Sequence, residues 1–182
     1  MALPPDGLLA FPADLAVWLG KPPDDPKLLA ALTAASRRFK GAVRHPVALV
    51  AADTVRLSGD GTNRLLLPAA PVTAVAAVLV DGAAVTDFKV KASEGVLLRT
   101  CGPWPDWSEV TVIYGHGYDP IPEDIQEAVI DQARAQYRLQ PGVQSIQAGG
   151  ESVTFGSTAA TGVTSQWTAA VDNHRLNRGD RS

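Results

Sequence analysis

The sequence has 182 residues, a formal net charge of −3 at pH 7, and a content of 46% hydrophobic and 19% charged residues. This length is sufficient for one domain with a core, or for one domain that carries an insertion. The slightly acidic balance argues against strong general attraction to nucleic acid. Cys101 is the single cysteine. An intramolecular disulfide is therefore excluded, and a reducing compartment is the natural environment.

The first twenty residues, MALPPDGLLAFPADLAVWLG, contain three prolines and no lysine or arginine. A signal peptide is not predicted, because it needs a basic start and an uninterrupted apolar run. The most apolar run, residues 65–80, is too short to span a bilayer and is interrupted by Pro68 and Pro71. The sequence therefore predicts a soluble protein that acts without a membrane.

Two helices are predicted in the N-terminal part. FPADLAVWLG carries Pro12 at an early helical position and Gly20 at its end. Residues 26–40 form the second helix, with Asp25 as N-cap. Its apolar residues recur at intervals of three and four: Leu28, Leu29, Leu32, Ala35 and Phe39. The cations of its last turn complement the helix dipole before Gly41 ends the helix, so DNA contact is not needed to explain them: Arg37, Arg38 and Lys40.

Residues 45–114 change to a period of two and to β-branched residues. Short predicted strands such as VALVAADTVRLSG and SEVTVIYG are separated by turns that contain Gly61, Gly82 or Gly95. Five or more strands at this spacing predict a small antiparallel sheet, sandwich or barrel. Trp104 and Trp107 lie in the proline-broken loop GPWPDW, where closing the end of the sheet is favoured over binding a sugar or a peptide.

A long helix is predicted over about 122–139, with Pro122 in its first turn and Pro141-Gly142 after its end. Acidic residues at its start and basic residues at its end complement the dipole: Glu123, Asp124, Arg134 and Arg138. One face is apolar: Ile125, Ala128, Val129, Ala133 and Tyr137.

The C-terminal segment is rich in glycine, serine and threonine, and its large apolar residues are far apart: Val153, Phe155, Val163, Trp167 and Leu176. These residues are too few for a core of their own, so we expect an extended arm that orders on a neighbouring protein. A short helix around 164–176 is the alternative for this part of the segment. Removal of residues 150–182 is expected to leave the remaining fold intact.

Together these elements predict an α+β fold. Its helical core consists of two N-terminal helices (1–44) and one long helix (119–148). A small antiparallel β-domain (45–118) is inserted between them, and an extended C-terminal arm (149–182) follows.

Gly115-His116-Gly117-Tyr118 joins the last strand to the long helix. A histidine between two glycines suggests a metal ligand or a catalytic base. However, His45, His174 and Cys101 show no ligand spacing, and the sequence contains no nucleophile-elbow, P-loop or GxGxxG pattern. We therefore interpret these four residues as a hinge in which glycine permits positive φ and a sharp exit from the sheet. The sequence predicts no catalytic residue, no metal and no cofactor, and hence no enzyme.

Three strings carry a family resemblance: LLLPAAPVTAVAAVLVDGAAV, VTVIYGHGYDPIPEDIQEAVIDQARAQY and GVQSIQAGGESVTF. Their order and spacing, over about 65 to 160, resemble head-to-tail adaptor (head–tail connector) proteins of long-tailed bacteriophages. The N-terminal helices agree with that family in kind but add no distinctive motif.

The resemblance implies a structural protein of the virion neck, present in the host cytoplasm during assembly. Twelve copies would form a ring under the portal protein and connect it to a head–tail stopper or tail-terminator protein. Viral double-stranded DNA would pass through the channel without sequence-specific binding. The C-terminal arm would grip the portal or a neighbouring subunit through Val153, Phe155, Trp167 and Leu176.

Two other functions stay open. The chain could be another neck protein, a stopper or a tail terminator, although these usually lack a long helix followed by an arm. It could also be a virion-associated carbohydrate-binding module that uses Trp104 and Trp107.

Overall fold

The computed structural model describes residue 4 and residues 7–138, 145–148, 151–154 and 164–176. The chain divides into two compact units. The helical unit comprises Met1–Val43 and Ile121–His174, and the β unit comprises Arg44–Pro120 with Arg175–Ser182. Both α and β elements are thus present, and the predicted α+β class is confirmed.

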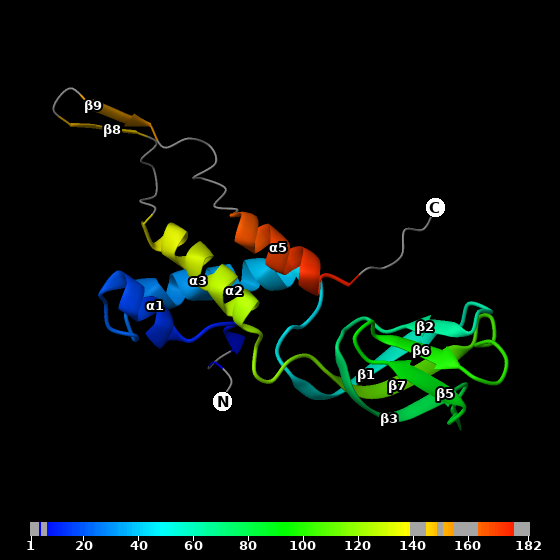
Figure 1. Cartoon of the computed structure of the whole chain (residues 1–182). Helices are drawn as coiled ribbons and strands as arrows, with labels where there is room; N and C mark the ends of the chain where they lie inside the picture. The colour runs from blue at the N-terminus through cyan, green and yellow to red at the C-terminus, as the bar shows by residue number, and fades with distance from the viewer. Residues whose placement is uncertain (1–3, 5–6, 139–144, 149–150, 155–163, 177–182) are drawn as a thin grey trace. The chain divides into compact units, whose positions relative to one another are not determined.

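The helical unit contains α1 (Pro12–Leu19), α2 (Pro26–Val43), α3 (Glu123–Arg138) and α5 (Ser165–His174), which are labelled in Figure 1. It also contains the antiparallel hairpin of β8 (Ser145–Ala148) and β9 (Glu151–Thr154). No helix in the described ranges is long and apolar enough to cross a membrane.

Helix ends follow local signals in the sequence. Gly20 closes α1 in the left-handed conformation, with φ of 61°. At the start of α2, the Leu28 amide donates to the Asp25 carboxylate at 2.9 Å, so the predicted N-cap is confirmed. The predicted end of this helix is wrong, because α2 continues through Gly41 to Val43. The left-handed residue that follows it is Arg44, with φ of 63°.

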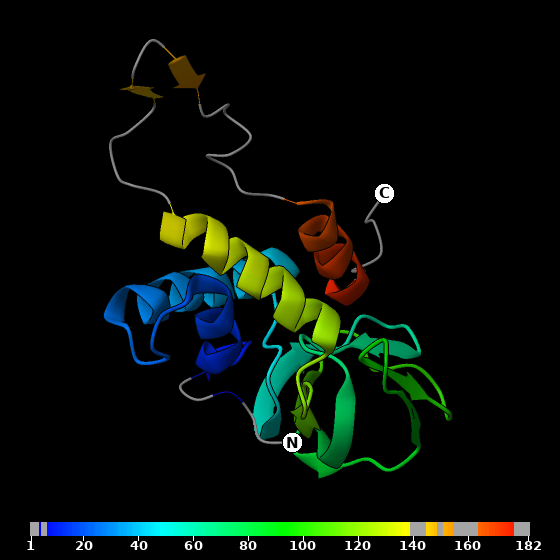
Figure 2. The same ribbon diagram turned by 60° about the vertical axis from the view of Figure 1, so that its left-hand side comes forward.

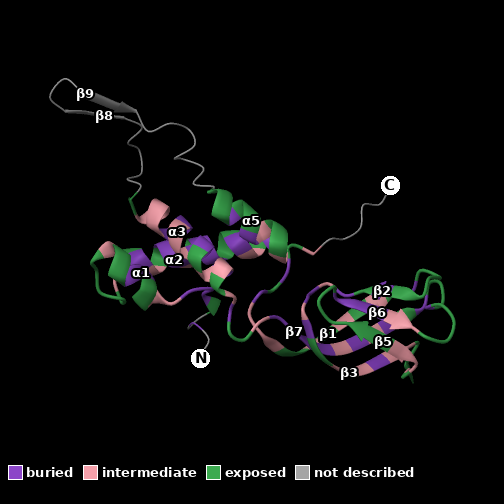
Figure 3. Cartoon of the chain, in the orientation of Figure 1, coloured by how far each residue is buried: buried purple, intermediate pink, exposed green. Residues whose placement is uncertain are grey.

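The core of the helical unit forms where α2 packs on α3, as both views show (Figures 1 and 2). Buried residues recur along both helices at helical spacing (Figure 3). In α2 they are Leu28, Ala31, Leu32, Ala35, Ser36, Phe39 and Val43, and in α3 they are Ile125, Ala128, Val129, Gln132 and Ala133. Each fully buried leucine or isoleucine contributes about 1.5–3 kcal/mol relative to its exposed state.

The helix α5 agrees with the short helix that the sequence allowed around 164–176, and differs from an extended arm at these residues. Trp167 is 5% exposed, and its ring meets that of Phe39 edge-on at 5.3 Å between centroids. The Thr164 hydroxyl caps the helix by accepting a hydrogen bond from the Trp167 amide at 3.1 Å. Trp167 and Ala170, one turn apart, are its two buried residues. Because α5 contributes to this core, removal of residues 150–182 should destabilise the helical unit, contrary to the expectation from the sequence.

The β unit consists of two antiparallel sheets. One has the order β1-β7-β3-β4 and the other the order β2-β6-β5. The strands are β1 (Val50–Ser58), β2 (Arg64–Leu66), β3 (Val72–Val80), β4 (Ala83–Ala84), β5 (Phe88–Lys91), β6 (Val96–Arg99) and β7 (Glu109–His116). One apolar cluster takes residues from both sheets, among them Leu97 of β6 and Val112 of β7. The predicted small antiparallel β-domain is therefore a two-sheet sandwich.

Candidate functional site

His116 is the last residue of β7 and is fully buried. Its Nε2 lies 3.3 Å from the Asp53 carboxylate of β1, and its ring lies 5.0 Å from that of Tyr114. Burial raises the pKa of the Tyr114 hydroxyl above its usual value. His116 is therefore packed inside the β unit next to a single carboxylate.

The glycines beside His116 allow close packing of the backbone. A Cβ on Gly117, whose φ is 94°, would lie 2.4 Å from the carbonyl oxygen of Ala48. A Cβ on Gly115 would lie 2.6 Å from the Thr73 hydroxyl. The predicted sharp exit thus has its physical basis in Gly117, because side chains are strained at this φ.

Backbone hydrogen bonds fasten the same segment to the β unit. The Gly117 amide donates to Pro71 O at 2.9 Å, and the Tyr118 amide donates to Val47 O at 2.9 Å. The chain passes from the β unit to the helical unit between Pro120 and Ile121. A hinge at Gly115, His116, Gly117 and Tyr118 stays a prediction, and these bonds favour bending after Tyr118.

Possible metal ligands are dispersed over the described residues, which contain no group of three or more histidines, cysteines or acidic residues suited to a metal ion. His45 Nδ1 contacts Pro46 O at 2.8 Å, whereas His174 Nε2 contacts the Asp124 carboxylate at 2.8 Å. Cys101 is exposed. The described residues therefore offer no obvious metal-binding site.

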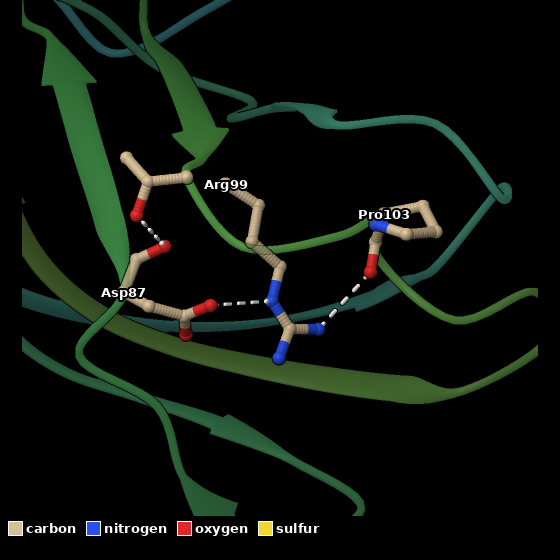
Figure 4. A network of polar contacts seen from close by, with 4 residues as sticks. Asp87, Arg99 and Pro103 are labelled. Atoms are coloured by element: carbon tan, nitrogen blue, oxygen red, sulfur yellow. Dashed lines mark hydrogen bonds and ion pairs between the residues drawn. The ribbon is translucent and has the colours of Figure 1, made fainter.

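Trp104 is fully buried and belongs to the core cluster of the sandwich. Arg99 holds the loop around it: Nε contacts the Asp87 carboxylate at 3.2 Å, and the guanidinium donates to Pro103 O at 3.1 Å (Figure 4). The same guanidinium lies 5.4 Å from the centroid of the Trp104 ring. This arrangement agrees with the predicted closing role.

Trp107 has the opposite environment, with 86% of its surface exposed. The sequence assigned one role to both tryptophans, whereas the structure separates them. Because Trp104 is buried, the two rings cannot together form an exposed platform for a sugar. The carbohydrate-binding alternative loses its main support.

The residues predicted to contact the portal come from different elements of the C-terminal segment. Trp167 packs on Phe39 of its own chain, and Leu176 is half-buried. Val153 pairs with Ile146 in the β8–β9 hairpin. Phe155 lies outside the described residues. A portal contact through these residues stays a prediction.

Other large apolar side chains are exposed and were not selected from the sequence. On α1, Val17 is 83% and Trp18 is 62% exposed, with the Arg134 guanidinium 4.6 Å from the Trp18 ring centroid. The sequence offered one signal for this surface: Val17 and Trp18 are adjacent, bulky and apolar, and they lie outside the buried face of a short helix. Exposed groups of this kind are typical of surfaces that bind other proteins.

The two-unit fold carries exposed apolar side chains, which are typical of proteins that bind other proteins. The chain belongs to the head completion protein family, whose model matches residues 17–176. This membership confirms the resemblance found in the sequence and identifies a structural virion protein. Comparison with curated proteins gives no match.

Solved structures share the fold over nearly the whole chain. A chain in the neck of a native gene transfer agent particle, computed with C12 symmetry, is 19% identical with a TM-score of 0.58; the match covers 97% of this chain and 94% of that one. A chain in the neck of the empty particle, computed with C6 symmetry, is 20% identical with a TM-score of 0.63, covering 100% and 96%. A chain of the native virion is 18% identical with a TM-score of 0.63, covering 100% and 96%. At these identities the likeness concerns the fold.

Proposed function

We propose that the chain is a head-to-tail adaptor, a ring-forming protein of the virion neck that connects the portal to a stopper or tail protein. The observation that carries this proposal is the match of the whole fold to neck chains, together with family membership over residues 17–176. Those neck structures were computed with C12 and C6 symmetry. A twelve-copy ring is the arrangement compatible with both.

The order of elements favours an adaptor over a stopper or a tail terminator. The long helix α3 is followed by a further C-terminal segment, which includes the β8–β9 hairpin and α5. A segment whose sequence has few large apolar residues is suited to binding a neighbouring protein. We infer that this segment binds the portal, with Val153, Phe155 and Leu176 as candidate contacts and Trp167 supporting them from the helical core.

The proposed role needs no enzymatic activity and no sequence-specific DNA contact. A net charge of −3 suits a channel through which DNA slides, because many cationic contacts to phosphate would retain it. The protein then functions by binding the portal, the neighbouring copies of the ring and a stopper or tail protein.

The oligomeric state with and without portal tests this proposal. We expect light scattering to show a monomer or a low oligomer for the isolated chain at micromolar concentration. Ordering a chain segment costs about 1–2 kcal/mol per residue, so the C-terminal segment should order fully only on a preformed neighbour. Added portal should recruit the chain into one large complex. A stable twelve-copy ring without portal, or no binding to portal, would contradict the proposal.

A further inference from the structure

Trp107 combines high exposure with an unfavourable backbone conformation. Its side chain is 86% exposed and its φ is 60°. Bulky residues rarely adopt positive φ, and such strain persists only where the surrounding structure imposes it. Neither exposure nor strain benefits the isolated β unit, which points to a role for this indole outside its own core.

The loop that carries Trp107 is held rigidly. The Trp107 amide donates to Gly59 O at 3.1 Å, and the Gly59 amide donates to Ser108 O at 2.9 Å. The Ser108 hydroxyl donates to Pro105 O at 2.7 Å. Only glycine fits at position 59, because a Cβ there would lie 1.9 Å from Pro105 O. The indole is therefore preorganised, and its binding to another surface would lose little conformational entropy.

The surroundings of Trp107 favour a cationic partner. Asp106 precedes it and is exposed, and Asp60 follows the glycine that accepts the Trp107 hydrogen bond. An indole attracts a guanidinium through its π face, and the two carboxylates would reinforce that attraction. The matching surface would present arginine side chains to the loop.

The same chain carries such a surface at the C-terminal end of α2. Four cations lie within residues 37–44, and the sequence from 26 to 52 contains no aspartate or glutamate: Arg37, Arg38, Lys40 and Arg44. Burial, and then the charge of Arg37, lower the pKa of the Lys40 ammonium. Arg37 is exposed. Its guanidinium is available to an acidic aromatic surface.

We propose that the Trp107 loop of one copy docks on the C-terminal end of α2 of a second copy, with Trp107 against the Arg37 guanidinium and Asp106 paired with the same group. A cyclic ring requires two different, complementary surfaces on every subunit, and this pair meets that condition. The inference rests on the proposed function, because it assigns a subunit contact within the proposed ring.

Charge exchange tests the contact directly. Sedimentation velocity over a concentration series would measure self-association of the full chain, Trp107→Ala, Asp106→Arg, Arg37→Asp and the double variant Asp106→Arg/Arg37→Asp. We expect each single variant to weaken association by on the order of tenfold, as for a central interface residue. The double variant should recover most of the loss because it restores opposite charges. Asp24→Arg, a charge reversal in an exposed turn, is the matched control and should associate like the unmodified chain.

Circular dichroism should show unchanged folding for all these variants, because the replaced side chains are exposed. The contact is refuted if the single variants associate like the unmodified chain, in solution and on added portal, or if the double variant stays as weak as the singles. Binding of the unmodified chain to portal is measured separately and does not depend on any of these results. The two proposals can therefore fail independently.

Discussion

Replacement of Trp104 with alanine is expected to destabilise the β unit by about 3–5 kcal/mol, the usual cost of removing a large aromatic side chain from a core. Trp104 is fully buried and packs in a cluster with Leu65, Leu97 and Val110. The Arg99 guanidinium over its ring would also lose its stacking partner. Since the indole nitrogen has no hydrogen-bond partner among the described residues, the loss comes from packing and stacking.

Trp107→Ala supplies a matched control from the same loop. Its indole is exposed, so its removal should change the free energy of unfolding by no more than about 0.5 kcal/mol. Hydrogen exchange measured peptide by peptide distinguishes the two units. We expect faster exchange in β6 and β7 for Trp104→Ala, with α2 and α3 unchanged. Equal effects of the two tryptophan variants would show that Trp104 does not close the sandwich.

Replacement of Trp167 with alanine should destabilise the helical unit by about 3 kcal/mol, at the lower end of the range for core aromatics because α5 covers the core from one side. The variant loses the edge-on contact with Phe39 and the Arg38 guanidinium, which lies 5.8 Å from the Trp167 ring centroid. Polar contacts would remain, since Gln166 donates to Glu127 at 2.7 Å and His174 contacts Asp124 at 2.8 Å. Because the lost contacts lie within the helical unit, hydrogen exchange in α2 and α3 should become faster, while exchange in the β unit should stay unchanged.

Trp18→Ala is the control for this variant, because Trp18 is 62% exposed and belongs to the same unit. Truncation after residue 148 should lower the melting temperature at least as much as Trp167→Ala, since it removes α5 altogether. If both changes leave the melting temperature unchanged, α5 does not belong to the core and the extended arm expected from the sequence is the better description.

The sequence was informative wherever a local signal decides the structure. The intervals from Leu28 to Phe39 predicted the buried face of α2, and Asp25 predicted its start. Of the two glycines expected to permit positive φ at the exit from the sheet, Gly117 takes it, whereas Gly115 does not and remains part of β7. In each case the residues that determine the conformation are neighbours in sequence, so periodicity and capping are sufficient.

Other features depend on contacts between distant residues. The helix α5 buries only Trp167 and Ala170, which is too weak a periodic signal, and its contacts come from distant residues such as Phe39 on α2 and Glu127 on α3. Trp104 and Trp107 occur in one short motif, yet burial of the first depends on residues from both sheets. The exposure of Val17 and Trp18 was not predicted, because an apolar residue of a helix normally faces a core. Tertiary packing determines whether such side chains are buried or exposed. The side chains that it leaves exposed form the surface available for assembly.

The proposed adaptor role requires copies of this chain to form a ring on a portal. Electron microscopy of the purified chain mixed with purified portal tests it most directly. We predict a second ring stacked coaxially on the portal, with an open channel and the helical unit and β unit repeated around the axis. Portal particles without added density, or a single copy bound off the axis, would contradict the adaptor assignment.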